Sequence, residues 1–186
     1  MSKVLTTFAY GEQSHLLDVS LPTFHRYART HGYDLFVPWR KTTARPYPWL
    51  KIPLIVSLLR VYDTVLWLDA DVVIRRFDVD IARETSAPVG VVVHHTPDGA
   101  VPNSGVWLIR ARAIDFVESL WWRNSFRRSE CWWEQAALIS ALGGDPDATP
   151  TSTPPGPMWA DGSTMAESAT TAEGWATQAF RCTSTS

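Results

Sequence analysis

The stretch from Asp63 to Ile74, DTVLWLDADVVI, constrains the fold more than any other part of the chain. Val65 to Leu68 is an unbroken run of strand-forming apolar residues, which is typical of a central strand covered on both faces. Asp69 and Asp71 follow that run directly. Because carboxylates are seldom buried unless they are paired or bind a metal, we expect the strand to end near Leu68, with both carboxylates at its C-terminal edge.

This edge of an open α/β sheet is where ligands bind. In extended chain, residues i and i+2 point the same way, so Asp69 and Asp71 can share a hard divalent cation such as Mn²⁺ or Mg²⁺. The tripeptide Asp-x-Asp alone does not decide between a metal site and a strand followed by a polar turn, because both use these residues.

The periodicity of apolar residues places this strand in an α/β domain. Strands are expected over residues 3–10, 33–39, 89–95 and 103–111, and helices over 14–31, 49–62, 113–122 and 132–142. Ser14 is the expected N-cap of the first helix and Gly32 its C-cap. Alternation of strand and helix in the first half predicts a mainly parallel sheet flanked by helices.

Composition limits which binding partners and which cellular location we expect for this chain. A net charge of −2 argues against strong attraction to nucleic acid. Two cysteines make neither a disulfide framework nor a zinc cluster, and no signal peptide or membrane-spanning run is apparent, so a cytoplasmic setting is expected.

From Gly143 onward there is no Leu, Ile or Val. We therefore expect a folded domain over residues 1–145 and an irregular, Thr/Ser/Pro/Ala-rich tail over 146–186. The oligomeric state stays open.

With its flanks, the sequence YDTVLWLDADVVI resembles the metal-binding signature of GT-A glycosyltransferases. Over residues 3–142 the chain is most similar to the retaining galactosyl-, mannosyl- and xylosyltransferase family of fungi and plants, and it also resembles glycogenin-like and bacterial lipopolysaccharide transferases. The resemblance implies that residues 1–145 form a nucleotide-sugar-binding domain with a GT-A-like (Rossmann-like) fold. It also implies metal-dependent transfer of a hexose or pentose, with retention, from a UDP- or GDP-linked sugar to an acceptor hydroxyl.

The resemblance implies functional roles for the residues of this chain that match the family's motifs. The metal ligands would be Asp69 and Asp71. The residues that would hold the donor nucleotide sugar are Thr7, Phe8, Ala9, Tyr10, Lys51, Asp69, Ala70, Asp71, Ser104 and Gly105. Those that would act on the donor sugar are Asn103, Glu134 and Gln135.

Most of these positions also have a purely structural interpretation. Tyr10 is equally compatible with a core aromatic at a strand end. Lys51 has the pattern of a lysine whose stem packs on apolar surface while its head is solvated. The residues from Pro102 to Gly105 are of types that favour a turn. Glu134 is an acid in the first turn of a helix, where the macrodipole favours it.

One family motif has no counterpart here. Members usually carry a C-terminal His-x-x-Gly segment that supplies a third metal ligand, and all five histidines of this chain precede Gly99. His94 or His95 can replace it, although neighbouring strand residues point to opposite faces, so at most one faces the site. The alternative function is a catalytically impaired nucleotide-sugar-binding or partner-binding remnant. A nucleotidyltransferase is disfavoured, because residues 10–13 lack a Gly-rich loop with a cation.

Overall fold

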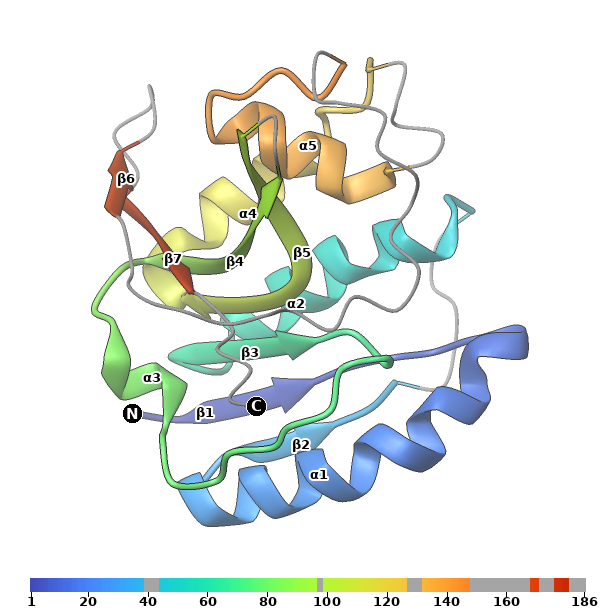
Figure 1. Cartoon of the computed structure of the whole chain (residues 1–186), viewed down its shortest axis with the longest axis vertical. Coiled ribbons are helices and arrows are strands. Elements are labelled where there is room, and N and C mark those ends of the chain that lie inside the picture. The colour runs from blue at the N-terminus through green and yellow to red at the C-terminus, as the bar shows by residue number, and fades with distance from the viewer. Residues whose placement is uncertain (39–43, 97–98, 127–131, 148–167, 171–175, 181–186) are drawn as a thin grey trace.

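The computed structural model describes residues 1–38, 44–96, 99–126, 132–147, 168–170 and 176–180. Within this part of the chain, seven strands form one sheet in the order β2-β1-β3-β5-β4-β7-β6 (Figure 1). The strands are β1 (Lys3–Thr6), β2 (Asp34–Phe36), β3 (Thr64–Leu68), β4 (Val89–Thr96), β5 (Gly99–Arg110), β6 (Ser168–Thr170) and β7 (Ala176–Phe180).

Helices cover both faces of the sheet. The α-helices are α1 (Leu16–His31), α2 (Lys51–Leu59), α3 (Ile81–Glu84), α4 (Ile114–Leu120) and α5 (Trp133–Ala141). The short 3-10 helices are η1 (Gly11–His15), η2 (Tyr47–Leu50) and η3 (Ala111–Ala113). Among the described residues, no helix combines the length and the apolar character needed to cross a membrane.

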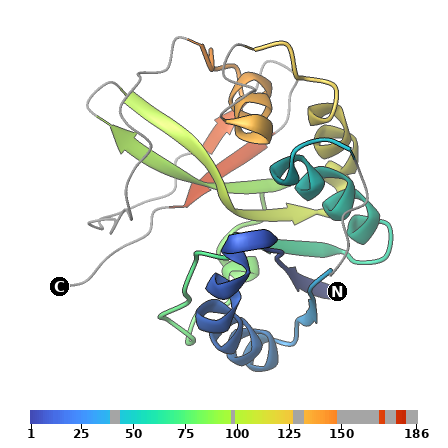
Figure 2. The ribbon, with the colours of Figure 1, turned by 90° about the vertical axis from the view of Figure 1, so that its right-hand side faces the viewer.

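The central strand β3 is buried along its whole length, as its unbroken apolar run predicts. Val65 and Trp67 pack into a core with α2, α4 and α5, whereas Leu66 and Leu68 pack into a second core with α1 and α3. Figure 2 shows α1 on one side of the sheet and α2, α4 and α5 on the other. The two-residue period of a strand therefore divides one apolar run between two cores.

The sheet is mixed, which corrects the expectation of a mainly parallel one. β1 pairs in parallel with β2 and β3, and β4 pairs in parallel with β7. β5 is antiparallel to both β3 and β4, and β6 is antiparallel to β7. The physical reason is that β4 returns directly into β5 as a hairpin, without the crossover helix that a parallel pairing requires.

Two local expectations have different outcomes. Gly32 ends α1 in the left-handed conformation at φ 69°, and its N–H donates to the Ala28 carbonyl, so the predicted C-cap is confirmed. Ser14 does not cap the helix, because it lies inside η1. The N-cap residue is His15, which makes no side-chain cap bond.

The segment for which composition predicts irregular chain contains β6 and β7. β7 extends the sheet beside Val89–Val92 of β4. A strand can be added through backbone hydrogen bonds alone, which do not require branched side chains. Because most of residues 146–186 lies outside the described residues, a domain boundary at residue 145 stays a prediction.

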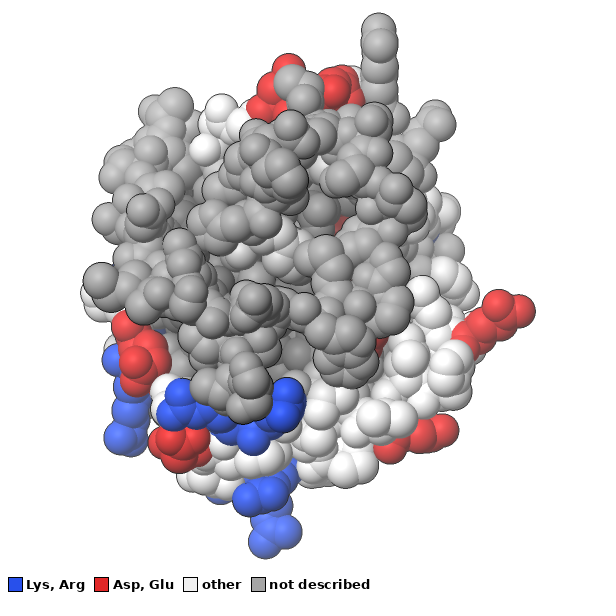
Figure 3. All heavy atoms as spheres, viewed as in Figure 1, with Lys and Arg blue, Asp and Glu red and all other residues white. Residues whose placement is uncertain are grey.

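The described surface carries charges of both signs. Figure 3 shows basic and acidic side chains side by side along its lower edge, in keeping with the net charge of −2.

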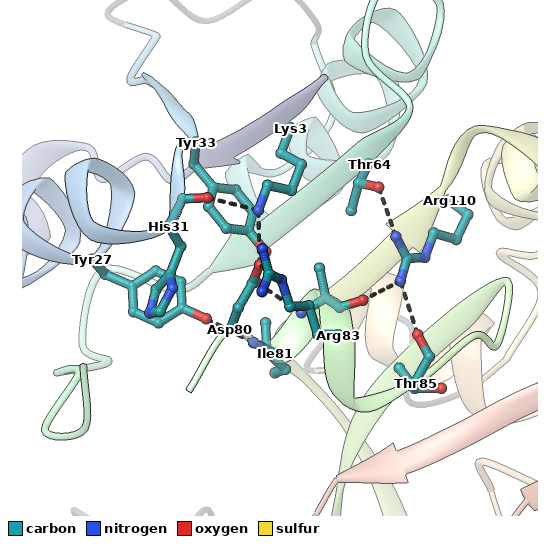
Figure 4. Close-up of polar contacts among 11 residues, drawn as sticks. Lys3, Tyr27, His31, Tyr33, Thr64, Asp80, Ile81, Arg83, Thr85 and Arg110 are labelled. Carbon is teal, nitrogen blue, oxygen red and sulfur yellow. Dashed lines mark hydrogen bonds and ion pairs between the residues drawn. The ribbon is translucent and has the colours of Figure 1, made fainter. Parts of the chain in front are cut away.

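Asp80 anchors the chain that returns from Asp71 toward β4. Its carboxylate accepts hydrogen bonds from Lys3 Nζ and the Tyr33 hydroxyl, both at 2.8 Å, and from the Ala82 N–H at the start of α3 (Figure 4). Burial acts to raise the pKa of Asp80, but the hydrogen bonds from Lys3, Tyr33 and Ala82 outweigh it and lower that pKa. This network lies at the N-terminal edge of β1, away from Asp69 and Asp71.

Replacing Asp80 by Ala should lower the free energy of unfolding by about 3 kcal/mol, because Lys3 and Tyr33 lose a buried charged partner. Urea denaturation measures this. The stabilisation by Asp80 is present above its unfolded-state pKa and is lost as the pH falls through its lower folded-state pKa. The difference between variant and wild type should therefore shrink below about pH 4.

Asp78→Ala is the matched control, since Asp78 pairs with Arg76 where both side chains are about two-thirds exposed, at 67% and 68%. Exposed pairs contribute little, so this variant should unfold like the wild type. Equal destabilisation by the two substitutions would contradict the anchoring role of Asp80.

Candidate functional site

The two carboxylates lie directly after β3, as the sequence predicts. β3 ends at Leu68, and a turn follows in which the Val72 N–H donates to the Asp69 carbonyl at 3.1 Å. The Asp69 N–H donates to the Gly105 carbonyl at 2.8 Å, which ties this turn to β5. Ala70 is buried, whereas Asp71 is exposed.

A bulge in β5 brings Gly105 against Asp69. Val91 of β4 pairs with Trp107, but Val92 pairs with Asn103, so residues 104–106 form an insertion opposite β4. A Cβ at Gly105 would lie 2.8 Å from Asn103 Oδ1 and 3.3 Å from Asp69 Oδ2. Glycine leaves room for this approach, since a Cβ here would force Asn103 Oδ1 to move and would press on the Asp69 carboxylate. The bulge in β5 directs Gly105 toward Asp69. Residues 102–105 therefore belong to a bulged strand, in agreement with the strand predicted over 103–111 and not with the alternative of a simple turn.

Lys51 is the centre of the site. Its ammonium group donates to Glu134 Oε1 at 2.7 Å and to the Ser104 carbonyl at 2.8 Å, and it pairs with Asp69 Oδ1 at 3.1 Å. The side chain is only 3% exposed. Burial alone would lower the pKa of Lys51, but Asp69 and Glu134 outweigh it and raise that pKa. The lysine therefore stays charged inside the domain.

This placement differs from the structural interpretation of Lys51, in which the head of the side chain is solvated. A side chain that is 3% exposed is not solvated, which excludes the solvated-head interpretation. Its ammonium group donates to protein oxygens, and its contact with a donor diphosphate stays a prediction. Its two carboxylate partners come from separate elements, Asp69 after β3 and Glu134 at the start of α5.

Three further predicted residues join the same network. Ser104 Oγ donates to Glu134 Oε1 at 2.9 Å, and the Ser104 N–H donates to Gln135 Oε1 at 3.2 Å. Asn103 Oδ1 accepts from the Gly105 N–H at 2.7 Å. Burial raises the pKa of Glu134, and the neighbouring Lys51 opposes that shift. The structure thus brings together residues that lie far apart in the sequence, although their contact with a donor stays a prediction.

The end of β1 lies beside this network. Thr7 is buried, and Phe8, Ala9 and Tyr10 are partly buried. Phe8 packs edge-on against Trp67, with ring centroids 4.9 Å apart, and Trp67 Nε1 donates to Asp69 Oδ1 at 2.7 Å. Within the described chain, the buried Thr7 hydroxyl has no hydrogen-bond partner.

The sequence patterns missed Tyr47. It stacks on Tyr10 with ring centroids 4.5 Å apart and planes 18° from parallel. Its segment has no helical or strand period, and the available signal is an aromatic residue between Pro46 and Pro48.

The donor set at this edge fits a hard divalent cation. Although the Asp71 side chain is exposed, neighbouring protein atoms partly desolvate its carboxylate, and this, together with the nearby Asp69 carboxylate, raises the pKa of Asp71. A cation would relieve the repulsion between the two carboxylates. Among the described residues, no group of three or more His, Cys, Asp or Glu is arranged to hold a metal, so His94 does not complete such a group. An ion here would take further oxygens from water or a phosphate. The side chain of His95 lies outside the described residues.

Comparison with solved structures identifies the type of fold. One similar structure is a glycosyltransferase involved in the glycosylation of the major capsid of PBCV-1, at 17% identity and a TM-score of 0.61, with 76% of each chain covered. Another is the glycosyltransferase GlyE of Streptococcus pneumoniae, at 15% identity and a TM-score of 0.53 over 75% of this chain. The fold is of the GT-A type.

The GT-A fold is what these comparisons establish. This chain spans 43% of the GlyE structure. No protein-family model matches the sequence, and no curated protein matches it either. In this GT-A fold, the Asp69–Asp71 turn occupies the C-terminal edge of the central strand, where ligands of open α/β sheets bind.

Lys51→Met should lower the free energy of unfolding by about 3–5 kcal/mol, because it leaves Glu134 and Asp69 without their buried counter-charge. Adding Glu134→Gln should recover part of the loss, since one uncompensated charge is then removed. Urea denaturation of both variants provides the measurement. Arg60→Met, at the exposed end of the same helix, is the control. A Lys51→Met protein as stable as wild type would refute the role of Lys51.

Proposed function

We propose that this chain is a metal-dependent glycosyltransferase that moves a hexose or pentose from a UDP- or GDP-linked sugar to an acceptor hydroxyl. The observation that carries the proposal is the paired carboxylates at the end of β3, with Asp69 held in place by the buried Lys51. The GT-A fold supports it, and the sequence resemblance adds the expectation that the anomeric configuration is retained.

The exposed carboxylate of Asp71 is the proposed direct ligand of Mn²⁺ or Mg²⁺. Asp69 presents one oxygen to Lys51 and Trp67 and keeps 37% of its side chain exposed, so it can share the ion or bind the donor ribose. When bound, a divalent ion neutralises the charge that grows on the leaving nucleoside diphosphate.

Two amides are placed to orient the donor sugar. Asn103 and Gln135 each use their side-chain oxygen on a backbone N–H of the β5 bulge. The groups they offer to sugar hydroxyls are therefore their NH₂ donors. Glu134 is buried against Lys51, so its proposed role is to position Asp69 through that lysine and not to touch the donor.

The end of β1 supplies the proposed seat of the nucleoside. Thr7, Phe8, Ala9 and Tyr10 lie beside Trp67 and Asp69. A buried hydroxyl without a partner, such as that of Thr7, is rare in proteins, and a bound nucleoside is one source of the missing partner.

UDP or GDP should bind this chain only in the presence of Mn²⁺ or Mg²⁺, because the diphosphate needs a counter-charge between itself and the two carboxylates. Isothermal calorimetry with and without EDTA tests this. Asp71→Ala should abolish the metal-dependent binding, whereas Asp78→Ala, an exposed carboxylate in a surface pair, should not. Equal binding in EDTA would contradict the proposal.

Gly105→Ala should weaken metal-dependent UDP binding by about tenfold or more, because its Cβ displaces both Asn103 Oδ1 and the Asp69 carboxylate, and small misplacements at a site have large effects. Calorimetry gives the affinity. Gly32→Ala is the control for a general loss of stability, since it strains a left-handed residue remote from the site. Unchanged affinity in Gly105→Ala would mean that Asp69 does not need its present position.

A further inference from the structure

Four aromatic rings form a continuous row at the end of β1. Tyr47 stacks on Tyr10, Tyr10 contacts Phe8 with ring centroids 5.3 Å apart, and Phe8 meets Trp67 edge-on. Trp67 then donates its indole N–H to Asp69 Oδ1. The row therefore connects the outermost ring, Tyr47, with the first carboxylate of the site.

Exposure rises along this row from the inside outward. Trp67 is 1% exposed, Phe8 and Tyr10 are partly buried, and Tyr47 is 45% exposed. Tyr10, the aromatic residue that the sequence resemblance points to for the base, has one face covered by the ring of Tyr47. A planar base cannot stack on that covered face. Tyr47 is the most exposed ring of the row.

Tyr47 also lies on the same helical segment as Lys51. η2 begins at Tyr47 and runs directly into α2, whose first residue is Lys51. The side chain that fixes Asp69 and the ring at the outer end of the row therefore belong to one short, continuous element.

We propose that Tyr47 is the platform on which the base of the donor nucleotide stacks, with Tyr10 supporting its ring from the other side. This inference rests on the proposed function, since it needs a nucleotide diphosphate at the Asp69–Asp71 edge. Every base has a π face, so a stacking platform serves uracil and guanine alike. Tyr47 thus supplies affinity for the base, and the carboxylates supply affinity for the metal-bound diphosphate.

The test compares a nucleotide with a probe that has no base. Binding of UDP, of GDP and of inorganic pyrophosphate is measured by calorimetry with Mn²⁺ present, for wild type, Tyr47→Ala and Tyr47→Phe. Tyr47→Ala should weaken binding of whichever nucleotide the wild type binds by about tenfold or more, because a base loses its aromatic partner. Pyrophosphate affinity should not change. Tyr47→Phe keeps the ring and should bind like the wild type.

Phe36→Ala is the matched control. Phe36 is equally exposed, at 45%, and lies at the C-terminal end of β2 at the same edge of the sheet. It is not part of the aromatic row, so its removal should leave nucleotide affinity unchanged.

The possible outcomes distinguish failure of this inference from failure of the proposed glycosyltransferase function. If wild type binds nucleotide with Mn²⁺ and Tyr47→Ala binds it equally well, the platform role is wrong while the proposed function stands. If Tyr47→Ala loses nucleotide and pyrophosphate to the same extent, Tyr47 acts on the whole site and not on the base, which also overturns the inference. If wild type binds neither probe, both fail together.

Discussion

The candidate site depends on one buried positive charge. The ammonium group of Lys51 neutralises Asp69 from the end of β3 and Glu134 from the start of α5, and it also donates to the Ser104 carbonyl in the β5 bulge. Two carboxylates this close to an apolar core would be strongly unfavourable without that partner. A single side chain of α2 thereby joins the three other elements that form the site, and Asp69 is fixed before any ligand arrives.

The segment that carries the paired carboxylates is held at both ends. Asp69 is tied to Lys51 and Gly105 at the C-terminal edge of the sheet, and Asp80 is tied to Lys3 and Tyr33 at the N-terminal edge. Asp71 lies between these anchors and stays exposed. This division, with one carboxylate fixed and one exposed, suits a metal that must be shared with a diphosphate, because the ion keeps positions for oxygens that the protein does not supply.

The sequence predicts local features better than it predicts pairings. β3 and the position of Asp69 follow from an apolar run that ends in carboxylates, and Gly32 ends α1 as expected. The antiparallel course of β5 does not follow, because the sequence does not show that β4 returns into β5 as a hairpin. The bulge does not follow either, since residues 102–105 have turn chemistry that also suits a bulge. The burial of Lys51 depends on Glu134, 83 residues away, and no periodicity within α2 reveals such a partner.

The central claim is that the edge bearing Asp69 and Asp71 transfers a sugar, and turnover tests it most directly. Wild type would be incubated with a panel of UDP- and GDP-linked sugars and Mn²⁺, and release of the nucleoside diphosphate followed over time. The account predicts release from at least one donor, dependent on Mn²⁺ and lost in Asp71→Asn. Tight metal-dependent nucleotide binding without release from any donor would contradict it, and would indicate a protein that binds nucleotide sugars but does not transfer them.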